Sequence, residues 1–222
     1  MQIPMMSLKM MKRLRIRGQL KMRMSGLKIL AATSNMHKYD EISSILNGIP
    51  YELVSLRTFE GISDVEEGDG SYYENAVLKA CGYSKQTGLP AIADDTGLEI
   101  DFLGGAPGIR SARFFDEGMP YEIRNRRLLE MMKDAPEGKR GARFVCCAVI
   151  ADGDRVIASF TGELKGSIAF EPDGGGGFGY DPVFLLEDGR TLASVAEGEK
   201  NSVSHRAEAM KKVAEYLKHN RI

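Results

Sequence analysis

The sequence contains no tryptophan, only three cysteines and no apolar run long enough to cross a membrane. The cysteines, Cys81, Cys146 and Cys147, are odd in number, and two of them are adjacent in an apolar segment. This pattern favours buried thiols in a reducing cytosol over a disulfide framework, and there is no C-x-x-C spacing to indicate a cysteine metal site. Because no stretch approaches the roughly 20 apolar residues of a membrane span, we expect a cytoplasmic protein without a membrane partner.

Charge is unevenly distributed along the 222 residues, whose formal net charge is −1. Residues 1–26 hold seven of the 30 basic residues and no acid, which leaves 23 basic and 31 acidic residues, a charge of −8, in the remainder. Because these remaining residues carry a net negative charge, they should bind nucleic acid poorly, and we expect no nucleic-acid partner. The chain therefore divides into a basic N-terminal appendage at 1–26, expected to be disordered, and one domain at 27–222. The alternatives for the appendage are a nucleic-acid arm, a transit-like segment and sequence upstream of a start near Met24.

Hydrophobic periodicity predicts alternating strands and helices from residue 27 onward. Apolar runs predict strands at 27–33, 51–56, 91–93, 98–102, 143–151, 155–162 and 183–186. Amphipathic spacing predicts helices at 36–46, 71–87, 121–133 and 204–219. Ser71 and Glu74 form a capping box for the second of these helices, and Asp152-Gly153 predicts a hairpin. Since helices are mixed with hairpins, we expect an α/β fold with a mixed sheet flanked by helices rather than a pure β-α-β repeat.

Two adjacent carboxylates, Asp94 and Asp95, follow the apolar residues 91–93 and precede Thr96-Gly97. We interpret them as the end of a buried strand that faces a cleft, because paired carboxylates are unfavourable unless they meet water or a cation. Such a pair is suited to binding Mg²⁺ and to activating a water for attack on a phosphate. The alternative is a polar turn, since Asp-Asp-Thr-Gly is also common turn composition.

The turn from the first strand into the first helix carries Thr33-Ser34-Asn35 and, one helical turn later, Lys38. Backbone N–H groups at a helix N-terminus carry partial positive charge, to which the hydroxyls and the lysine add further donors. This combination suits a triphosphate. The alternative interpretation is an ordinary helix cap beside a surface lysine.

Glu67 lies in an acidic loop just before the helix on which Asn75 and Lys79 share a face. From that position Glu67 could share a cation with Asp95. The alternative is a solvated acidic loop, and three neighbouring acids compete with Glu67 for any metal role: Asp64, Glu66 and Asp69.

Two segments towards the C-terminus carry groups that suit a nucleobase. The loop 174–182 is rich in glycine, so its backbone can approach a ligand closely, while Phe178 can stack on a base and Asp181 can accept hydrogen bonds. Lys200 and Ser204-His205-Arg206 lie at the start of the last helix, where they suit a keto oxygen or a phosphate. The alternatives are a flexible loop tip and ordinary first-turn helix residues, and no Gly-x-Ser-x-Gly elbow supports a Ser-His-Asp triad. In one acidic chain, the four groups together indicate a Mg²⁺-dependent nucleoside triphosphate hydrolase.

Six motifs occur in order along the chain: Thr-Ser-Asn-x-x-Lys (33–38), Glu-Asn-Ala-x-x-Lys-Ala (74–80), Ala-Asp-Asp-Thr-Gly-Leu (93–98), Gly-Ala-Pro-Gly-Ile-x-Ser-Ala-Arg (105–113), Gly-Gly-Phe-Gly-Tyr-Asp-Pro (176–182) and Ser-His-Arg (204–206). Over about residues 27–217 this set closely resembles the inosine triphosphate pyrophosphatase family, the non-standard purine NTP pyrophosphatases also called XTP/dITP diphosphatases. Thr96 and Ser34 stand where many members have Ser and Gly, and residues 1–26 have no counterpart in the family pattern.

The resemblance implies hydrolysis of ITP, dITP and XTP to the nucleoside monophosphate and pyrophosphate, which cleanses the nucleotide pool. It also implies a homodimer and an elongated mixed β-sheet whose flanking helices form two lobes around a central cleft. The resemblance further implies that Asp95 is the proton acceptor for the attacking water. It also implies that Mg²⁺ is held by Glu67 and Asp95, with Asp94 assisting. The implied substrate-binding residues are Thr33, Ser34, Asn35, Lys38, Lys79, Thr96, Phe178, Gly179, Tyr180, Asp181, Lys200, His205 and Arg206.

The preference of the site for particular purine bases is expected to depend on its hydrogen-bond donors. Hypoxanthine and xanthine carry a keto oxygen at position 6, to which Arg206 and nearby N–H groups can donate. The amino group of adenine would leave a buried donor unpaired there, at about 1–3 kcal/mol, so Arg206→Ala is expected to weaken dITP selectively. Guanine also has the keto group, so its exclusion needs another feature.

Three other functions are consistent with parts of the sequence. A non-catalytic regulator that binds purine nucleotides is disfavoured by the intact Glu67 and Asp95 pair. A nucleic-acid-binding protein that uses the basic arm is disfavoured by the acidic body. A pyrophosphatase of modified pyrimidine nucleotides is disfavoured by the Ser-His-Arg and Phe-Gly-Tyr-Asp-Pro motifs.

Overall fold

The computed structural model describes residues 26–116 and 118–222 of the protein. Apart from Gly26, the basic appendage predicted at 1–26 lies outside these residues. The helices are α2 (Met36–Ile45), α3 (Tyr72–Thr87), α4 (Tyr121–Met131), α5 (Glu197–Val203) and α6 (His205–His219), and the strands are β1 (Lys28–Ala31), β2 (Glu52–Ser55), β3 (Ala91–Ile100), β4 (Pro107–Gly108), β5 (Gly141–Asp152), β6 (Arg155–Ile168) and β7 (Phe184–Leu185). None of the helices in these two ranges has the length and apolarity that crossing a membrane requires.

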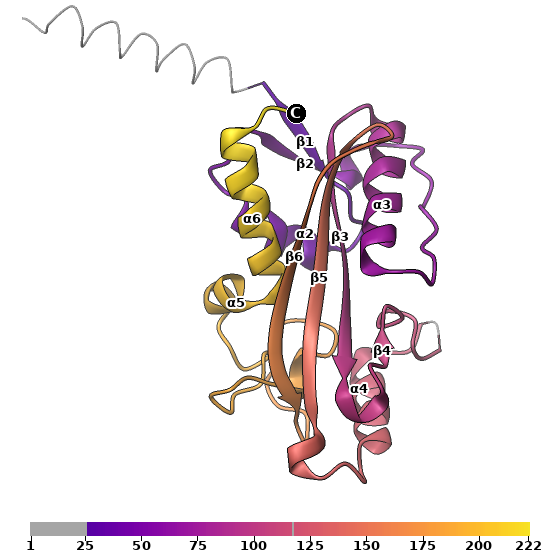
Figure 1. The fold of residues 1–222 in the computed structure, drawn as a ribbon, viewed down its shortest axis with the longest axis vertical. Coiled ribbons are helices and arrows are strands. Elements are labelled where there is room, and N and C mark those ends of the chain that lie inside the picture. The colour runs from indigo at the N-terminus through magenta and orange to yellow at the C-terminus, as the bar shows by residue number, and fades with distance from the viewer. Residues whose placement is uncertain (1–25, 117) are drawn as a thin grey trace, which may run out of the picture.

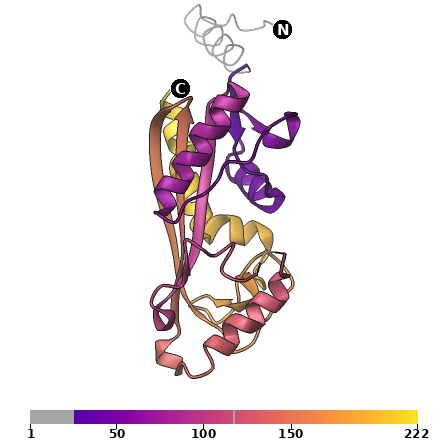
Figure 2. The same cartoon turned by 90° about the vertical axis from the view of Figure 1, so that its right-hand side faces the viewer.

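The strands form one mixed sheet in the order β2-β1-β3-β5-β6-β7, and β4 pairs with β3. β1 pairs in parallel with β2 and β3, whereas the other neighbours are antiparallel. The three longest strands, β3, β5 and β6, run along most of the molecule; α2, α3 and α6 lie around its upper half, α4 lies at the lower end and α5 lies between them (Figures 1 and 2). Two lobes therefore share three strands, which confirms the predicted α/β class with an elongated mixed sheet.

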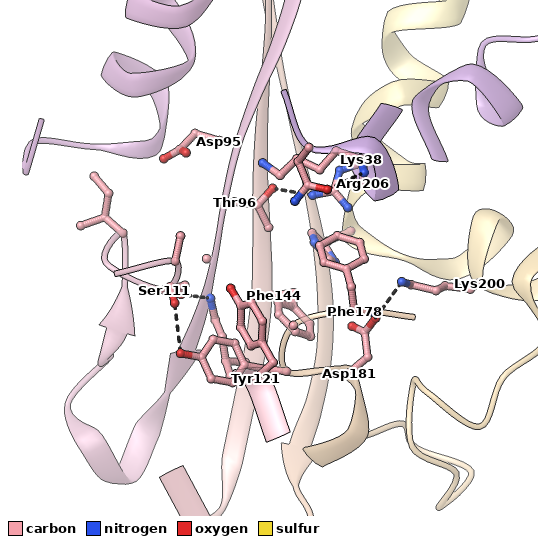
Figure 3. Close-up of a pocket in the computed structure, with 18 of the residues that line it drawn as sticks. Lys38, Asp95, Thr96, Ser111, Tyr121, Phe144, Phe178, Asp181, Lys200 and Arg206 are labelled. Atoms are coloured by element: carbon pink, nitrogen blue, oxygen red, sulfur yellow. Dashed lines mark hydrogen bonds and ion pairs between the residues drawn. The ribbon is translucent and has the colours of Figure 1, made fainter. Parts of the chain in front are cut away.

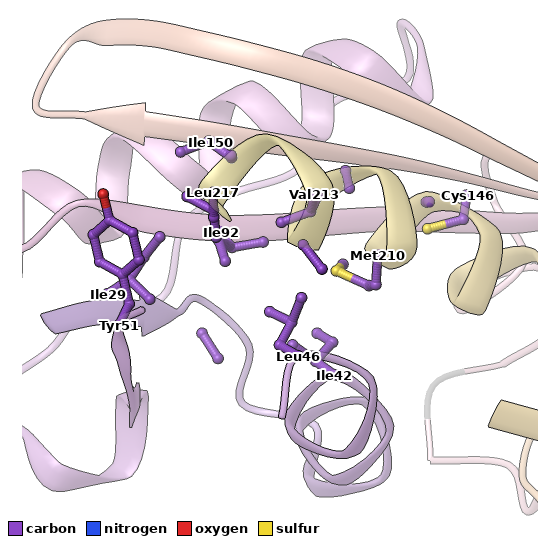
Figure 4. Packing of buried hydrophobic residues seen from close by; sticks show 14 residues of the cluster. Ile29, Ile42, Leu46, Tyr51, Ile92, Cys146, Ile150, Met210, Val213 and Leu217 are labelled. Atoms are coloured by element: carbon purple, nitrogen blue, oxygen red, sulfur yellow. The ribbon is translucent and has the colours of Figure 1, made fainter. Parts of the chain in front are cut away.

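Side chains of β5 alternate between the two faces of the sheet, and so helices cover both faces. Cys146 and Ile150 pack with α2 and α6 on one face, in the core that Figure 4 shows. Cys147 and Val149 pack with α3 on the other face. Both cysteines are buried free thiols, as the sequence predicts, whereas the third free thiol, Cys81, is only partly buried.

A separate core fills the second lobe, where the same long strands meet α4 and β7. Its main members are Leu98, Ile100, Leu128, Met132, Phe144, Ile168 and Phe184. Along β3, the cores of the first lobe end at Ala93 and the core of the second begins at Leu98. Residues 94–97 therefore lie where the lobes meet.

One strand boundary differs from the prediction in a way that matters for the site. The predicted strands at 91–93 and 98–102 are a single strand, β3, which pairs with β5 without a break from Ala91 to Ile100. Asp94 and Asp95 thus lie in mid-strand, and neither the predicted strand end nor the polar-turn alternative is correct. The two acids can lie in the middle of β3 because each carboxylate contacts a positively charged side chain.

The C-terminal half holds two smaller differences. β6 continues past the predicted end at 162 to Ile168, because its pairing with the long strand β5 extends to Ser167. Helix α5 forms between the predicted strand at 183–186 and the predicted helix at 204–219, where the sequence predicts no element. The predicted hairpin at Asp152-Gly153 is confirmed by the pairing of Asp152 with Arg155.

Candidate functional site

Two adjoining cavities occupy the cleft, and Figure 3 shows the one nearer the second lobe. Both are lined by Asn35, Lys38, Glu67 and Ala112. Every residue that the sequence predicts for catalysis, metal binding or substrate binding lines one or both of them. The fold thus brings together residues that are up to 173 positions apart, from Thr33 to Arg206. We call the cavity in Figure 3 the first cavity and its neighbour, at the N-terminus of α2, the second cavity.

The start of α6 reaches the cleft because it packs closely on β6. Ser204 caps the helix, and its Oγ accepts the N–H of Ala207 at 3.1 Å. Gly162 of β6 lies against this first turn, where a Cβ would meet the carbonyl oxygen of His205 and stand 2.6 Å from the nitrogen of Ala209. A side chain at position 162 would therefore push the helix, and with it the residues that it presents, out of the cleft.

Asp94 and Asp95 point to opposite faces of β3, as successive residues of a strand do. Asp95 Oδ1 lies 2.9 Å from Lys79 Nζ, whereas Asp94 Oδ2 lies 3.1 Å from Lys38 Nζ. The structure therefore brings Asp95 together with Glu67 on Lys79, whereas Asp94 contacts a different lysine and lines the second cavity with Glu67 and Lys79. The described residues hold no group of three or more His, Cys, Asp or Glu arranged to bind a metal ion.

Asp94 is a buried anion whose Oδ2 meets several donors, while its Oδ1 has no partner among the described residues. Its Oδ2 accepts from Thr96 Oγ1 at 3.0 Å and from two nitrogens of Arg206 at 3.2 Å each. Burial favours a raised pKa, but Lys38 and Arg206 outweigh it and hold the pKa of Asp94 below the usual aspartate range. Asp94 is therefore an ionised group that orients Lys38 and Arg206 at the cleft.

Asp95 and Glu67 converge on the ammonium group of Lys79, whose Nζ lies 2.9 Å from Asp95 Oδ1 and 2.6 Å from Glu67 Oε1. Burial raises the pKa of Asp95, although Lys79 opposes the shift. The pKa of Lys79 is raised despite its burial, because the neighbouring carboxylates favour the charged form. Mg²⁺ is commonly held by one or two carboxylates, with waters and substrate phosphates completing its coordination. Two carboxylates that converge on one cation beside an open cavity fit that pattern.

Of the four acids that the sequence offers in the loop before α3, Glu67 pairs with Lys79 beside Asp95, and Asp64 also lines the second cavity. The side chain of Glu67 is 28% exposed, while that of Asp69 is 59% exposed and contacts Arg110. The peptide of Gly68 is held by Asn75, whose Oδ1 accepts its N–H at 2.8 Å and whose Nδ2 donates to its carbonyl at 3.2 Å. Sequence reasoning placed Asn75 beside Lys79 but did not identify it as the anchor of the loop.

The turn between β1 and α2 is a helix cap that also faces the second cavity. Asn35 Oδ1 accepts the N–H groups of His37 at 3.0 Å and Lys38 at 3.4 Å, and Thr33 Oγ1 accepts that of Asn35 at 3.2 Å. The capped turn nevertheless lines the cavity together with Ser34 and Lys38. The cap and the anion site predicted at this turn are therefore compatible.

The glycine-rich loop is held in place by side chains, unlike a free loop tip. Asp181 Oδ2 accepts the N–H of Phe178 at 2.8 Å and contacts Lys200 Nζ at 2.7 Å. The same ammonium group lies 4.8 Å from the centre of the Phe178 ring. Tyr180 donates its hydroxyl to the carbonyl of Ser111 at 3.0 Å. Phe178 is thus presented to the first cavity as a fixed aromatic surface.

Arg206 is 1% exposed, and most of its donors are already engaged. Its Nη1 lies 2.5 Å from Glu41 Oε2, and its other nitrogens contact Asp94 and Thr96. Glu41 also pairs with Lys200 at 2.7 Å, so one buried carboxylate joins two cations from the C-terminal part of the chain. Sequence analysis missed Glu41. The available signal was a charged residue beside Ile42 on the face of α2 that is buried.

His205 is the polar group of the first cavity that the described residues leave without a partner. Both ring nitrogens are buried with no hydrogen bond, and the ring stacks on Phe144 at 4.7 Å and 15°. Burial, together with the charge of Arg206, lowers the pKa of His205 well below its ordinary value. The imidazole is therefore neutral near pH 7, with one N–H donor and one acceptor. Since buried polar groups are nearly always hydrogen-bonded, His205 is suited to bind a ligand in this cavity.

Mild acid is expected to destabilise the protein through His205. In the unfolded chain histidine titrates near pH 6.5, whereas burial and Arg206 keep the folded imidazole neutral at lower pH. Below about pH 6.5 the unfolded state binds a proton that the folded state does not, so the free energy of unfolding should fall by about 1.4 kcal/mol per pH unit. Above that pH the ring is neutral in both the folded and the unfolded state, so His205 does not contribute to the pH dependence of the free energy of unfolding.

Urea unfolding at pH 7, 6 and 5 measures this dependence. His205→Phe places another aromatic ring beside Phe144 and should be less sensitive to pH than the wild type by about that slope. The same pH dependence in both proteins would contradict the assignment of a neutral, buried His205.

The sequence resembles known proteins over most of its length. Residues 29–216 match the model of the Ham1 family. The chain is 41% identical over 191 residues to the dITP/XTP pyrophosphatase of Geobacter sulfurreducens, an alignment that covers 86% of this chain and 96% of that protein. It is 42% identical over 194 residues to the dITP/XTP pyrophosphatase of Escherichia coli strain K12, covering 86% and 98%.

Solved structures share the fold as well as the sequence. A HAM1 protein from Coxiella burnetii matches with a TM-score of 0.80 and 34% identity, over 87% of this chain and 100% of that chain. A protein from Mycobacterium abscessus, described as nucleoside-triphosphatase / dITP/XTP pyrophosphatase, matches with a TM-score of 0.67 and 38% identity, over 84% and 97%.

Proposed function

The chain belongs to the Ham1 family, and we propose on this basis that it hydrolyses ITP, dITP and XTP to the nucleoside monophosphate and pyrophosphate. Its high similarity to proteins named dITP/XTP pyrophosphatase supports this activity. The structural observation that carries the proposal is the pair of Asp95 and Glu67 on Lys79. This pair lies between the cavity at the N-terminus of α2, which suits a triphosphate, and the cavity that contains His205, which suits a purine.

Mg²⁺ is the metal that this donor set favours, and Glu67 and Asp95 are the residues that would hold it. When bound, the ion polarises a phosphate and lowers the pKa of a bound water. Asp94, which was expected to assist, contacts Lys38 and Arg206 through Oδ2, while its Oδ1 has no partner among the described residues. We therefore assign Asp94 the role of orienting those two cations.

Asp95 accepts the proton of the attacking water in this proposal. Burial raises its pKa and so makes it a stronger base than an exposed aspartate. Attack at the α-phosphorus breaks the bond to the oxygen that bridges the α- and β-phosphates. Pyrophosphate leaves with that oxygen, and the water oxygen stays on the monophosphate. Lys38, Lys79 and the N-terminus of α2 stabilise the negative charge that develops on the phosphates.

The choice of base rests on the first cavity. Arg206, the donor predicted from the sequence, already contacts Glu41, Asp94 and Thr96. We therefore assign the donor for the 6-keto oxygen to His205, whose ring nitrogens have no partner among the described residues. The tautomer that donates to a keto oxygen would place its N–H against the amino group of adenine, at about 1–3 kcal/mol when both are buried, whereas the other tautomer would accept from that amino group.

Assembly and compartment follow from the same proposal. The family resemblance supports a homodimer, and the buried free thiols Cys146 and Cys147 are compatible with a reducing cytoplasm. Both remain proposals for this chain.

Hydrolysis of dITP in ¹⁸O-labelled water, followed by mass spectrometry of the products, tests the reaction. We expect one ¹⁸O atom in dIMP and unlabelled pyrophosphate. Labelled pyrophosphate would mean attack at the β-phosphorus, and dIDP with labelled orthophosphate would mean attack at the γ-phosphorus; either result contradicts the proposal. Binding of dITP without product would support the regulator alternative.

A further inference from the structure

Arg110 and Arg113, which follow β4, contact the acidic loop that carries Glu67, and the proposed reaction gives them no role. Nη2 of Arg113 donates to the carbonyl of Gly68 at 2.7 Å and to Asp69 Oδ1 at 2.9 Å, and its Nη1 lies 3.4 Å from Glu67 Oε2. Among the described acidic residues, Arg110 contacts only Asp69. Its Nε lies 3.2 Å from Asp69 Oδ1, and its Nη2 lies 2.9 Å from Oδ2. Only one of the two arginines therefore contacts Glu67.

The peptide that follows Glu67 is held from two sides. On one side, Asn75 of α3 pairs with both the N–H and the carbonyl of Gly68, and its Nδ2 lies 3.4 Å from Asp95 Oδ2. On the other side, Arg113 donates to the same carbonyl. Asn75 is fully buried and belongs to the first lobe, whereas Arg113 comes from the loop after β4. Glu67 is thus fixed by residues from both sides of the cleft.

Such fixing is needed because Glu67 and Asp95 carry like charges. Both carboxylates contact the same ammonium group, that of Lys79, and two like charges held so close together repel each other. Residues 59–71 form no helix or strand, and regular backbone hydrogen bonds therefore do not hold Glu67 in place. Contacts from side chains have to do so.

We propose that Arg113 is a positioning residue, which holds Glu67 beside Asp95 through the carbonyl of Gly68 and through Glu67 Oε2. This inference rests on the proposed function, in which Glu67 binds the metal. Arg113 lines neither cavity, unlike Lys38 and Lys79, and its contacts are with the loop. Its effects should therefore pass through Glu67 and not through the substrate.

Metal binding without nucleotide tests the proposal directly. Arg113→Gln is compared with Arg110→Gln, which removes the same charge from the same loop but no contact with Gly68 or Glu67. The probe is Mn²⁺, followed by the electron paramagnetic resonance signal of the free ion. We expect Arg113→Gln to raise the dissociation constant of Mn²⁺ about 10-fold, within the usual range for losing a group that orients a metal ligand. Arg110→Gln should bind Mn²⁺ like the wild type.

Kinetics and a double variant separate positioning from phosphate binding. In Arg113→Gln, the Mg²⁺ concentration for half-maximal pyrophosphate release should rise about 10-fold, while the KM for dITP at saturating Mg²⁺ stays unchanged. In a Glu67→Gln background, adding Arg113→Gln should change neither Mn²⁺ binding nor kcat further, because the residue through which Arg113 acts is already lost. Arg113→Lys keeps the charge but lacks the planar fork, and should resemble Arg113→Gln.

Two results would overturn the proposal. One is an equal effect of Arg113→Gln and Arg110→Gln on Mn²⁺ binding, and the other is a further loss in the double variant. A raised KM for dITP with unchanged Mn²⁺ binding would assign Arg113 to the phosphates instead. Failure of the wild type to hydrolyse dITP would refute the proposed function, whereas the Mn²⁺ comparison would still decide whether Arg113 positions Glu67.

Discussion

Replacing Asp95 by asparagine is expected to lower kcat for dITP about 10³-fold or more while the protein stays folded. Asparagine keeps the shape but cannot accept the proton of the attacking water, and the loss of a general base typically costs about 10²–10⁴-fold. The fold should survive because Lys79 retains Glu67 as a partner at 2.6 Å. The substitution also removes one of two repelling charges.

Steady-state pyrophosphate release at saturating Mg²⁺ and dITP measures this effect, and circular dichroism with thermal unfolding checks the fold. Asp152→Asn is a matched control, because Asp152 lies in the β5–β6 hairpin and lines neither cavity. A kcat close to wild type in Asp95→Asn would exclude Asp95 as the proton acceptor.

Arg206→Ala is expected to cost about 3–5 kcal/mol of stability, the usual penalty for removing one partner of a buried ion pair. Arg206 is 1% exposed, and its guanidinium contacts Glu41 and Asp94, both of which are buried. Without Arg206, two carboxylates would remain buried with fewer donors. The sequence alone predicted a selective loss of dITP binding. In the structure the same carboxylates orient Lys38 and Lys200, so we now expect every nucleotide to be affected.

Urea unfolding at pH 7 measures the loss. Arg190→Ala is a suitable control, because Arg190 also pairs with two carboxylates, Asp188 and Glu199, but on an exposed surface where such pairs contribute little. Adding Glu41→Gln to Arg206→Ala should restore part of the stability, since it removes a buried carboxylate that has lost one of its two cations, while Lys200 keeps Asp181 as a partner. Equal stability of Arg206→Ala and Arg190→Ala would contradict the role of Arg206 as the centre of a buried network.

Sequence patterns predicted which residues gather at the cleft but not how they pair. Asp94 and Asp95 look equivalent in the sequence, and both were expected at the metal. Because they lie in one continuous strand, their side chains point to opposite faces and meet different cations. The continuity of β3 depends on its pairing with β5, some 50 residues further along the chain. Hydrophobic periodicity in a short window cannot detect such pairing.

Patterns in a short window of sequence also cannot identify the partners of Glu41 and Arg113. Glu41 lies 165 residues before its partner Arg206, and Arg113 lies 46 residues after Glu67. Both residues are charged and have no special local spacing, so only the fold identifies their partners. By contrast, Ser71, Ser204 and the Asp152-Gly153 hairpin were predicted correctly, because caps and tight turns depend on neighbouring residues.

The central claim is metal-dependent release of pyrophosphate from non-standard purine nucleoside triphosphates. Initial rates with dITP, XTP, dATP and dGTP, each with Mg²⁺ and with EDTA, test it most directly. We expect fast release from dITP and XTP with Mg²⁺, slow release from dATP and dGTP, and no release in EDTA. Equal rates for dITP and dATP, or full activity in EDTA, would contradict it.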